Sequence, residues 1–323
     1  LRMYLGIILE RFRSTLKGLQ AIELGHSSDS PQFGAVEDGL GMASNDYKYA
    51  INEIRLEEEL NDALYHDDFA LHYQPIIDLR TKRLVGFESL LRWQHAKRGL
   101  LLPSDFLPTA EASGLIVPIG ARVFRSACRF LGRLAALYPA PPGVDELFVS
   151  INISARDFTN PHFVDDVVRM TREAGVSPAR VKLEVTETTL VSQPEVVADA
   201  LTQLSDRGYS IAIDDFGTGY SSLSYLHKFP FDTLKIDRGF VQNLSSSEKN
   251  DKIVASIAAL ANHLDLVVVA EGVETRAQER TVVDLDCTFA QGYLYARPMP
   301  EITAATFAAN WGNGISMQLR KLG

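Results

Sequence analysis

The sequence predicts an α/β fold in which eight strands close into a barrel surrounded by helices. Apolar runs alternate with amphipathic stretches over about 250 residues, and such units imply parallel strands joined by right-handed crossovers. The runs are short, rich in β-branched residues and end at polar residues, as buried parallel strands do. Two runs near residue 80 lie too close for a crossover, so we expect a modified TIM-like barrel with one antiparallel strand. An open doubly wound sheet is the alternative, but no glycine-rich first turn is present.

The first 45 residues are expected to form an N-terminal helical extension and a linker. Residues 25–45 are rich in Gly, Ser and Asp, which is typical of a linker. Residues 1–24 have apolar positions at a three-four spacing broken only by Thr15, which predicts a helix that pairs with a partner or packs on its own domain. These positions are Leu5, Ile8, Phe12, Leu19 and Ile22. The main domain is expected over residues 46–310, with a tail over 311–323.

The first half of the main domain opens with a helix expected over residues 47–65. Strands follow at 70–79 and 83–93, and the polar connection between them predicts a hairpin. Residues 99–115 contain Pro103 and Pro108 and are expected to form a loop. We expect next a helix through Cys128 to Leu137 and a strand within 146–154 that ends near Asn152.

The second half repeats the strand and helix pattern. Strands are expected at 181–188, 210–222, 233–237, 265–275 and 287–293, the last two ending near Glu271 and Gln291. Helices are expected between them, at 162–174, 194–208, 251–263 and after residue 275. Gly175 and Gly208 follow two of these helices and are typical stop signals.

Composition limits the possible partners. The chain has 323 residues with 46% hydrophobic and 23% charged residues, which is typical of one soluble domain with an extension. A net charge of −9 offers no basic surface for duplex nucleic acid or anionic membrane. No apolar run approaches the roughly 20 residues that span a bilayer, so no membrane contact is expected within this chain. Cys128 and Cys287 lack metal-ligand spacing, which favours a reducing compartment. The absence of an initial Met suggests a fragment.

Several ionisable side chains lie at the downstream ends of the expected strands. Parallel strands bring these ends to one rim of a barrel, where such a set of charges requires compensation. Divalent metal is the natural compensation, because hard cations prefer oxygen ligands. The side chains expected on this rim are Glu88, Asn152, Glu184, Asp214, Asp215, Lys235, Glu271 and Gln291.

Seven segments in this order resemble the EAL domains, which are phosphodiesterases of cyclic di-GMP. The segments are ESLLR (88–92), INIS (151–154), LEVTET (183–188), DDFGTGYSSLSYL (214–226), LKID (234–237), AEGVET (270–275) and QGYLYARPMP (291–300). Ser89 departs from the family's Ala, but a strand neighbour of Glu88 faces the opposite side, so we expect activity to survive.

The resemblance implies two magnesium or manganese ions, with calcium expected to inhibit. Glu88, Asn152, Glu184 and Asp214 would hold one ion, and Asp214 would bridge to a second held with Asp215 and Glu271. Glu271 is either a ligand or the acceptor of the water's proton. Two ions can activate water and stabilise charge on a phosphodiester, giving linear pGpG.

Further residues of the resemblance have expected roles beside the ions. Lys235 would face the carboxylates and the attacking water. Glu187 would support the loop of residues 217–222, which in the family couples metal binding to dimerisation, and we count Glu187 with Lys235 and Glu271 in the catalytic set. The expected substrate-binding residues are Gln74, Arg92, Gln291 and Asp215. Asp237 and Arg238 are expected in a local turn or ion pair.

Two other functions remain open at this point. A catalytically weak EAL domain would act as a receptor that binds cyclic di-GMP without cleaving it. A barrel acting on another phosphodiester or an enolisable acid would explain the carboxylates but not the order of the motifs. The resemblance also implies a homodimer in the bacterial cytoplasm, with a sensory or diguanylate cyclase-like domain or a membrane tether outside this sequence. No GGDEF-type motif is present in residues 1–50.

Overall fold

The computed structural model describes residues 51–137, 146–217, 223–244 and 246–312. The helix expected over residues 1–24, the linker, the boundary near residue 46 and most of the tail therefore lie outside the described residues. The helix expected from residue 47 is described from residue 51 and continues to residue 66.

Eight strands close into a barrel, and seven of them are mutually parallel. β1 is the exception: it lies between β2 and β9 and is antiparallel to both. The expected barrel with one antiparallel strand is thereby confirmed. The barrel strands are β1 Phe69–Asp78, β2 Leu84–His95, β4 Phe148–Asn152, β5 Val181–Thr186, β6 Ser210–Phe216, β7 Thr233–Ile236, β8 Val267–Ala270 and β9 Phe289–Ala290.

A tight turn joins β1 to β2 and explains the antiparallel pair. The Asp78 carboxylate accepts hydrogen bonds from the backbone N–H groups of Arg80 and Thr81, at 2.9 and 2.6 Å. Such a short connection can join only antiparallel neighbours. Two short strands, β3 Gly99–Leu101 and β10 Met299–Pro300, extend the sheet beside β2 and β1.

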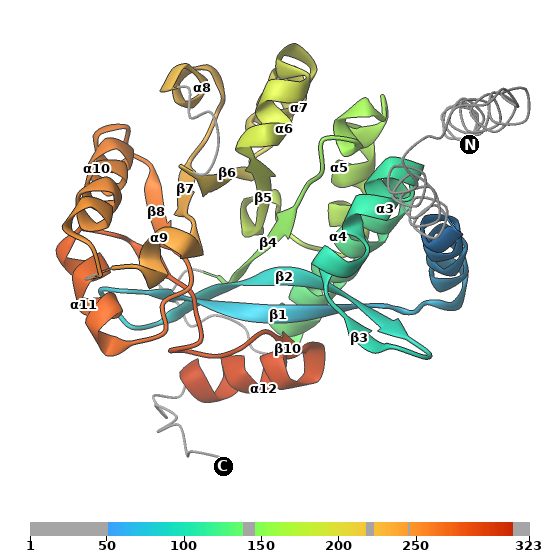
Figure 1. Cartoon of the computed structure of the whole chain (residues 1–323), viewed down its shortest axis with the longest axis horizontal. Coiled ribbons are helices and arrows are strands. Elements are labelled where there is room, and N and C mark those ends of the chain that lie inside the picture. Colours follow the sequence, from blue (N-terminus) through green and yellow to red (C-terminus); the bar gives the residue numbers. More distant parts are fainter. Residues whose placement is uncertain (1–50, 138–145, 218–222, 245, 313–323) are drawn as a thin grey trace, which may run out of the picture.

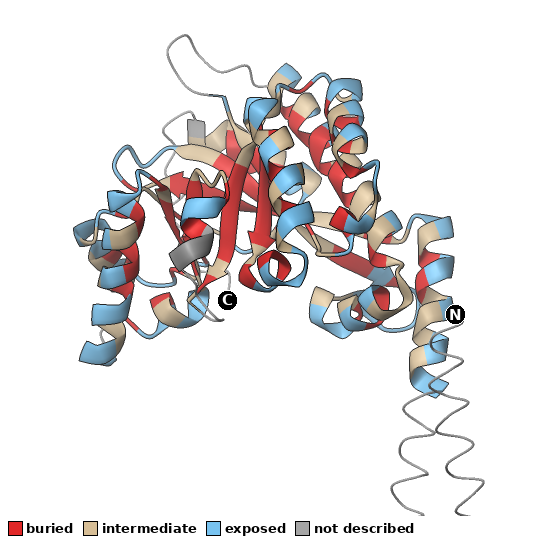
Figure 2. Cartoon of the chain, turned by 90° about the horizontal axis from the view of Figure 1, so that it is seen from above, coloured by how far each residue is buried: buried red, intermediate tan, exposed pale blue. Residues whose placement is uncertain are grey.

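Helices surround the barrel on its outer side (Figure 1). Buried residues gather on the strands and on the helix sides that face them (Figure 2). The first five residues of β5 are all buried, which explains its continuous apolar run. The helices are α3 Leu107–Ser113, α4 Ile116–Leu137, α5 Phe163–Glu173, α6 Glu187–Ser192, α7 Pro194–Asp206, α8 Leu223–Lys228, α9 Arg238–Gln242, α10 Glu248–His263, α11 Arg276–Asp284 and α12 Glu301–Gly312, and short 3₁₀ helices lie at Pro103–Asp105, Asp157–Thr159 and Pro178–Arg180.

The expected loop over residues 99–115 is wrong. This segment contains β3, a 3₁₀ helix and α3. Pro103 and Pro108 lie in the first turn of the 3₁₀ helix and of α3, where proline's missing N–H costs no helical hydrogen bond. Proline therefore marks helix starts in this segment rather than a loop.

Candidate active site

The downstream ends of the barrel strands form one mouth, and the predicted site residues meet there. Glu88 lies on β2, Asn152 ends β4, Glu184 lies on β5, and Asp214 and Asp215 lie on β6. Lys235 lies on β7, while Glu271 and Gln291 directly follow β8 and β9. These residues are the ones expected on one rim, and contacts among them bring them together at one site.

The Lys235 side chain lies at the centre of this mouth and is 1% exposed. Its ammonium lies within ion-pair distance of four carboxylates, which are carried by β2, β5, β6 and the residue that follows β8. The distances from Nζ are 2.6 Å to Glu271, 2.8 Å to Glu184, 3.2 Å to Asp214 and 3.6 Å to Glu88. One cation thus faces four carboxyl groups, so full ionisation of all four would leave a local excess of negative charge.

The carboxylates form two overlapping groups that could each hold a cation. Oxygen atoms of Glu88, Glu184 and Asp214 lie within 4.8 Å of one another, as do those of Asp214, Asp215 and Glu271. Asp214 belongs to both groups, as expected for a residue that bridges two ions. The buried Oε1 atom of Glu184 has no hydrogen-bond partner among the described residues. An unpaired buried oxygen is costly unless a cation or water satisfies it, so the donor set fits a hard divalent metal.

Two amide side chains hold the carboxylates in place. Gln291 Nε2 donates to Glu88 at 2.6 Å and to Glu271 at 3.2 Å, and therefore links β2 to the residue that follows β8. Asn152 Nδ2 donates to Glu88 at 3.2 Å. The buried Gln291 Oε1 also lacks a partner among the described residues.

Burial and mutual repulsion perturb the ionisation of this group. Burial raises the pKa of Glu184 to about 8 against the opposing effect of Lys235, with Glu88 and Asp214 adding repulsion. Burial likewise raises the pKa of Glu271 well above its ordinary value. Burial would lower the pKa of Lys235, but Asp214, Glu184, Glu271 and Glu88 raise it well above normal, so the ammonium keeps its proton. Without divalent cations, protons therefore neutralise part of the carboxylate set.

A β-bulge turns two consecutive aspartates toward the mouth. Neighbouring residues of a regular strand face opposite sides, so Asp214 and Asp215 could not both belong to the site without an irregularity. The β6–β7 register shifts between Ile213 and Phe216, and Asp215 has a left-handed backbone with φ 54°. The Asp214 carboxylate accepts a hydrogen bond from the Asp215 N–H at 2.9 Å. A bulge re-aims side chains in this way at a cost of about 1–2 kcal/mol for a non-glycine residue with a left-handed backbone.

The Asp215 carboxyl is perturbed as well. Burial, with repulsion from Asp214, raises the pKa of Asp215 to about 6.

Gly292 allows Gln291 to reach the mouth. A Cβ atom at Gly292 would lie 2.1 Å from the backbone oxygen of Val273. The Val273 N–H in turn donates to the carbonyl of Gln291 at 3.0 Å. The segments after β8 and β9 can approach this closely only because residue 292 has no side chain.

The predicted substrate-binding residues Gln74 and Arg92 are buried beside the mouth. Gln74 Nε2 donates to the backbone oxygen of Ala296 at 3.2 Å, and so holds the segment after Gln291. The Arg92 guanidinium donates a hydrogen bond to the backbone oxygen of the preceding residue, Leu91, at 2.7 Å. Burial lowers the pKa of the Arg92 guanidinium against the effects of Tyr293 and Glu88.

Sequence reasoning missed two cationic or titratable residues next to this region. The Arg297 guanidinium lies over the Tyr293 ring, 4.2 Å from its centroid. His72 lies on β1 two positions before Gln74, and burial and then Arg92 lower its pKa. Strand alternation places His72 on the same face as Gln74, and this signal would have found it.

Three residues outside the charged cluster have local structural partners. Glu187 begins α6 rather than ending a strand, because Thr186 caps that helix, and its Oε1 accepts from the Gly217 N–H at 3.0 Å. The rest of the loop after Gly217 lies outside the described residues. The Ser89 hydroxyl donates to the backbone oxygen of Ser150 at 2.9 Å. Asp237 caps α9 through the Gly239 N–H, as expected for a local turn.

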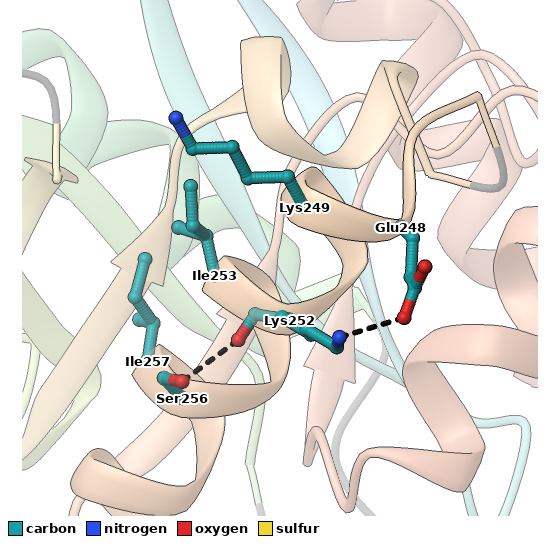
Figure 3. A pocket seen from close by; sticks show the side chains of 6 residues that line it. All are labelled: Glu248, Lys249, Lys252, Ile253, Ser256 and Ile257. Carbon is teal, nitrogen blue, oxygen red and sulfur yellow. Dashed lines mark hydrogen bonds and ion pairs between the residues drawn. The ribbon is translucent and has the colours of Figure 1, made fainter.

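The hollow shown in Figure 3 is separate from this mouth. Its volume is about 520 Å³, and all of its lining residues belong to α10. Lys252 and Glu248 form an exposed ion pair of 2.6 Å beside it. Exposed pairs of this kind contribute little to stability, and this hollow adds no group to the charged cluster.

Comparisons with known proteins agree with this geometry. The family model for the EAL domain matches residues 57–298. Cyclic di-GMP phosphodiesterase NbdA of Pseudomonas aeruginosa is 39% identical over 273 residues, which cover 84% of this chain and 34% of NbdA. The bifunctional diguanylate cyclase and phosphodiesterase MucR of the same organism is 39% identical over 282 residues, which cover 86% of this chain and 40% of MucR. The chain thus spans well under half of these two relatives.

Solved structures are also similar. The PaMucR phosphodiesterase in complex with c-di-GMP has a TM-score of 0.73 and 41% identity, covering 77% of this chain and 99% of that one. The EAL enzyme Bd1971, with cAMP and cyclic di-GMP bound, has a TM-score of 0.80 and 32% identity, covering 94% of this chain and 76% of that one. Among the described residues, no helix combines the length and apolar character that a membrane span requires.

Proposed function

This chain belongs to the EAL domain family, and from that premise we propose that it hydrolyses cyclic di-GMP to linear 5′-pGpG in a reaction that depends on magnesium or manganese. The observation that carries the proposal is the set of four carboxylates around the buried Lys235 at one mouth of the barrel. An excess of anions at this depth is costly, and a pair of divalent cations would offset it.

Two overlapping groups of side chains would hold the cations. Glu88, Asn152, Glu184 and Asp214 would hold one, and Asp214, Asp215 and Glu271 the other. When bound, the cations would acidify a water molecule and neutralise charge on the phosphodiester. The unpaired Glu184 oxygen and the shared position of Asp214 support this assignment.

The chain's own groups would orient the reaction. Lys235 holds the Glu271 carboxylate at 2.6 Å, and its high pKa keeps a positive charge beside the attacked phosphate. Glu271 would either bind a cation or, in its ionised form, accept the proton of the attacking water. Gln291 links Glu271 to Glu88 and so fixes their separation.

The substrate would be held beside these groups. The Arg92 guanidinium would donate a bidentate pair of hydrogen bonds to a phosphate, and Gln291 and Asp215 would face the nucleotide. Gln74 would act by holding the chain at Ala296 and presenting the oxygen of its amide. Glu187 would support the catalytic arrangement indirectly, by fixing the backbone at Gly217.

A direct assay tests the proposal. Purified protein is incubated with cyclic di-GMP and magnesium or manganese, and pGpG is measured by chromatography. Glu271→Gln should lower the rate by about 100-fold or more, the range for losing a general acid or base. Glu274→Gln is the matched control, because this residue lies in the same segment, is exposed, and accepts a hydrogen bond from the surface residue Gln242. Calcium should occupy the site and suppress turnover.

The outcomes separate enzyme from receptor. Absence of pGpG with either metal would refute the enzyme. Tight binding of cyclic di-GMP without turnover would instead favour a receptor module, while cleavage of unrelated phosphodiesters at equal rates would favour a different substrate. We also propose a homodimer in the bacterial cytoplasm, and sedimentation of the intact chain tests the dimer.

A further inference from the structure

The helix over residues 51–66 buries one face in the core, and a second stripe carries the exposed side chains Ile51, Ile54 and Tyr65. Leu60 and Ala63 are fully buried, and Leu56 and Leu64 are partly buried against the same core. On the opposite side Ile51, Ile54 and Tyr65 are 38%, 47% and 86% exposed. With 3.6 residues per turn, these three lie on one narrow stripe that also includes Glu58 and Asn61.

The spacing of this stripe is that of a helix-pairing seam. Its five positions are separated by three, four, three and four residues, which is the heptad pattern of two packed helices. A helix face with this pattern gains stability when a second amphipathic helix covers it. In the part of the chain that the structure describes, the apolar side chains of this stripe are therefore left exposed beside the start of β1.

The start of the chain carries a matching pattern. Positions 8, 12, 15, 19 and 22 have the same spacing, and all are apolar except Thr15. If the two segments run antiparallel, Ile22 faces Ile51 and Leu19 faces Ile54. The polar Thr15 then faces the polar Glu58, so the one break in the first stripe coincides with a polar position in the second.

Charge also distinguishes this partner from a second copy of the helix. Residues 1–24 contain four basic and two acidic residues, whereas residues 51–66 contain one Arg and five acidic residues. Two copies of the acidic helix would repel each other, and a parallel pair would place Glu58 against Glu58 in the seam. The basic segment attracts the acidic one. The 21 residues from 25 to 45 are rich in Gly and Ser and are long enough to reverse the chain.

We propose that residues 5–22 dock as a helix, antiparallel, on the stripe formed by Ile51, Ile54, Glu58, Asn61 and Tyr65 of the same chain. The resulting helical hairpin covers the exposed apolar side chains and closes this seam to other partners. The proposal does not depend on the enzymatic activity.

Cross-linking of the full chain tests the partner and its direction. The variant Leu19→Cys/Ile54→Cys is treated with a short bis-maleimide and separated under denaturing conditions. It should give mainly an intrachain product of monomer mass. The matched variant Leu5→Cys/Ile54→Cys should give at least about fivefold less, because antiparallel packing places Leu5 near the other end of the helix. The buried Cys128 and Cys287 serve as a background measured in the parent chain.

Other outcomes overturn the proposal. A product of dimer mass would assign the stripe to a second copy, equal yields from both variants would exclude the stated register, and no product would exclude docking. Hydrogen exchange provides an independent measurement that does not rely on cysteine variants. Amides of residues 8–19 should exchange at least about tenfold more slowly in the parent than in Phe12→Asp, and equally fast exchange in both chains would overturn the docking.

Discussion

The two ends of the barrel each contain a buried lysine, but the surroundings of the two lysines differ. Lys182, at the start of β5, is 9% exposed at its side chain and faces Asp232 at 3.3 Å. Its ammonium also contacts the Thr233 hydroxyl and lies 5.2 Å from the centroid of the Phe148 ring. Lys235, at the other end, faces four carboxylates.

The comparison shows how surroundings separate a structural charge from a functional one. Lys182 has one anion for one cation, and 44% of the Asp232 side chain is exposed to solvent. The Lys235 cluster has more anions than it can neutralise, and nearly all of them are buried. A buried pair of one cation and one carboxylate needs no further counter-ion. A buried set with more carboxylates than cations indicates that further cations bind there.

The largest effect is expected when Lys235 is replaced by methionine, and the same replacement at Lys182 is the comparison. Lys235→Met leaves four carboxylates without their cation, and should lower phosphodiesterase activity by about 100-fold or more and stability by about 3–5 kcal/mol. Lys182→Met should cost about 1–3 kcal/mol and leave activity per folded molecule within about twofold. Denaturant unfolding and pGpG assays measure both. Equal losses of activity in the two variants would contradict the assignment of Lys235 to function and of Lys182 to structure alone.

A third buried carboxyl group, Asp157, extends the comparison to a site where the described partners are hydrogen-bond donors rather than a cation. Asp157 accepts bonds from the Ser154 N–H and hydroxyl, at 2.8 and 2.7 Å, and burial raises its pKa to about 6. Because the folded pKa exceeds the ordinary 3.8, the unfolded chain releases this proton first, and folding stability falls as pH rises between these values.

The consequence for Asp157 is a pH-dependent difference from Asp157→Asn. Parent stability relative to the variant should fall by about 3 kcal/mol in total, with about 2 kcal/mol of it between pH 4.5 and 7. Urea unfolding of both proteins across this range measures the difference. Parallel stability curves would show that Asp157 titrates normally in the folded chain.

Divalent ions should stabilise the mouth but not the opposite end. At 100 times the dissociation constant, magnesium or manganese should raise the unfolding free energy by about 2.7 kcal/mol. Glu184→Gln should lose most of this shift, whereas Lys182→Met should keep it. Thermal unfolding with and without metal provides the measurement, and an undiminished shift in Glu184→Gln would place the ions elsewhere.

The smallest effect is expected at Ser89. Replacing it by Ala removes the hydrogen bond to the Ser150 carbonyl, at a cost of about 0.5–1.5 kcal/mol. The hydroxyl contacts backbone rather than the carboxylates, so the rate of pGpG formation should change less than twofold. A tenfold change in rate would mean that this bond controls the position of Glu88.

The sequence predicted much of the barrel because its signals are local and strong. Buried runs ending in carboxylates identified the strands, and parallel topology brought Glu88, Glu184, Asp214 and Lys235 to one rim. Regular alternation, however, assigns neighbouring residues to opposite faces, so it could not predict the bulge that directs both Asp214 and Asp215 to the mouth.

Three further features could not be predicted from the sequence, one because its partner lies far away in the chain and two because the local signal is ambiguous. Nothing local to Gln74 indicates that its amide holds the backbone at Ala296, 222 positions later. The prolines at 103 and 108 were ambiguous, because the same residue ends one helix and begins another. The start of α6 at Glu187 was missed because the apolar strand and the helix share a continuous run, and only the Thr186 cap separates them.

The central position of Lys235 affects the order in which the protein can be assembled. The Lys235 ammonium is carried by β7 and contacts carboxylates of β2, of β5 and of the residue that follows β8, so the chain supplies its own counter-ion where these segments meet. The barrel can therefore close before any divalent ion arrives. Removing the ions with a chelator should abolish the phosphodiesterase activity, while the protein stays folded and able to bind the ions again.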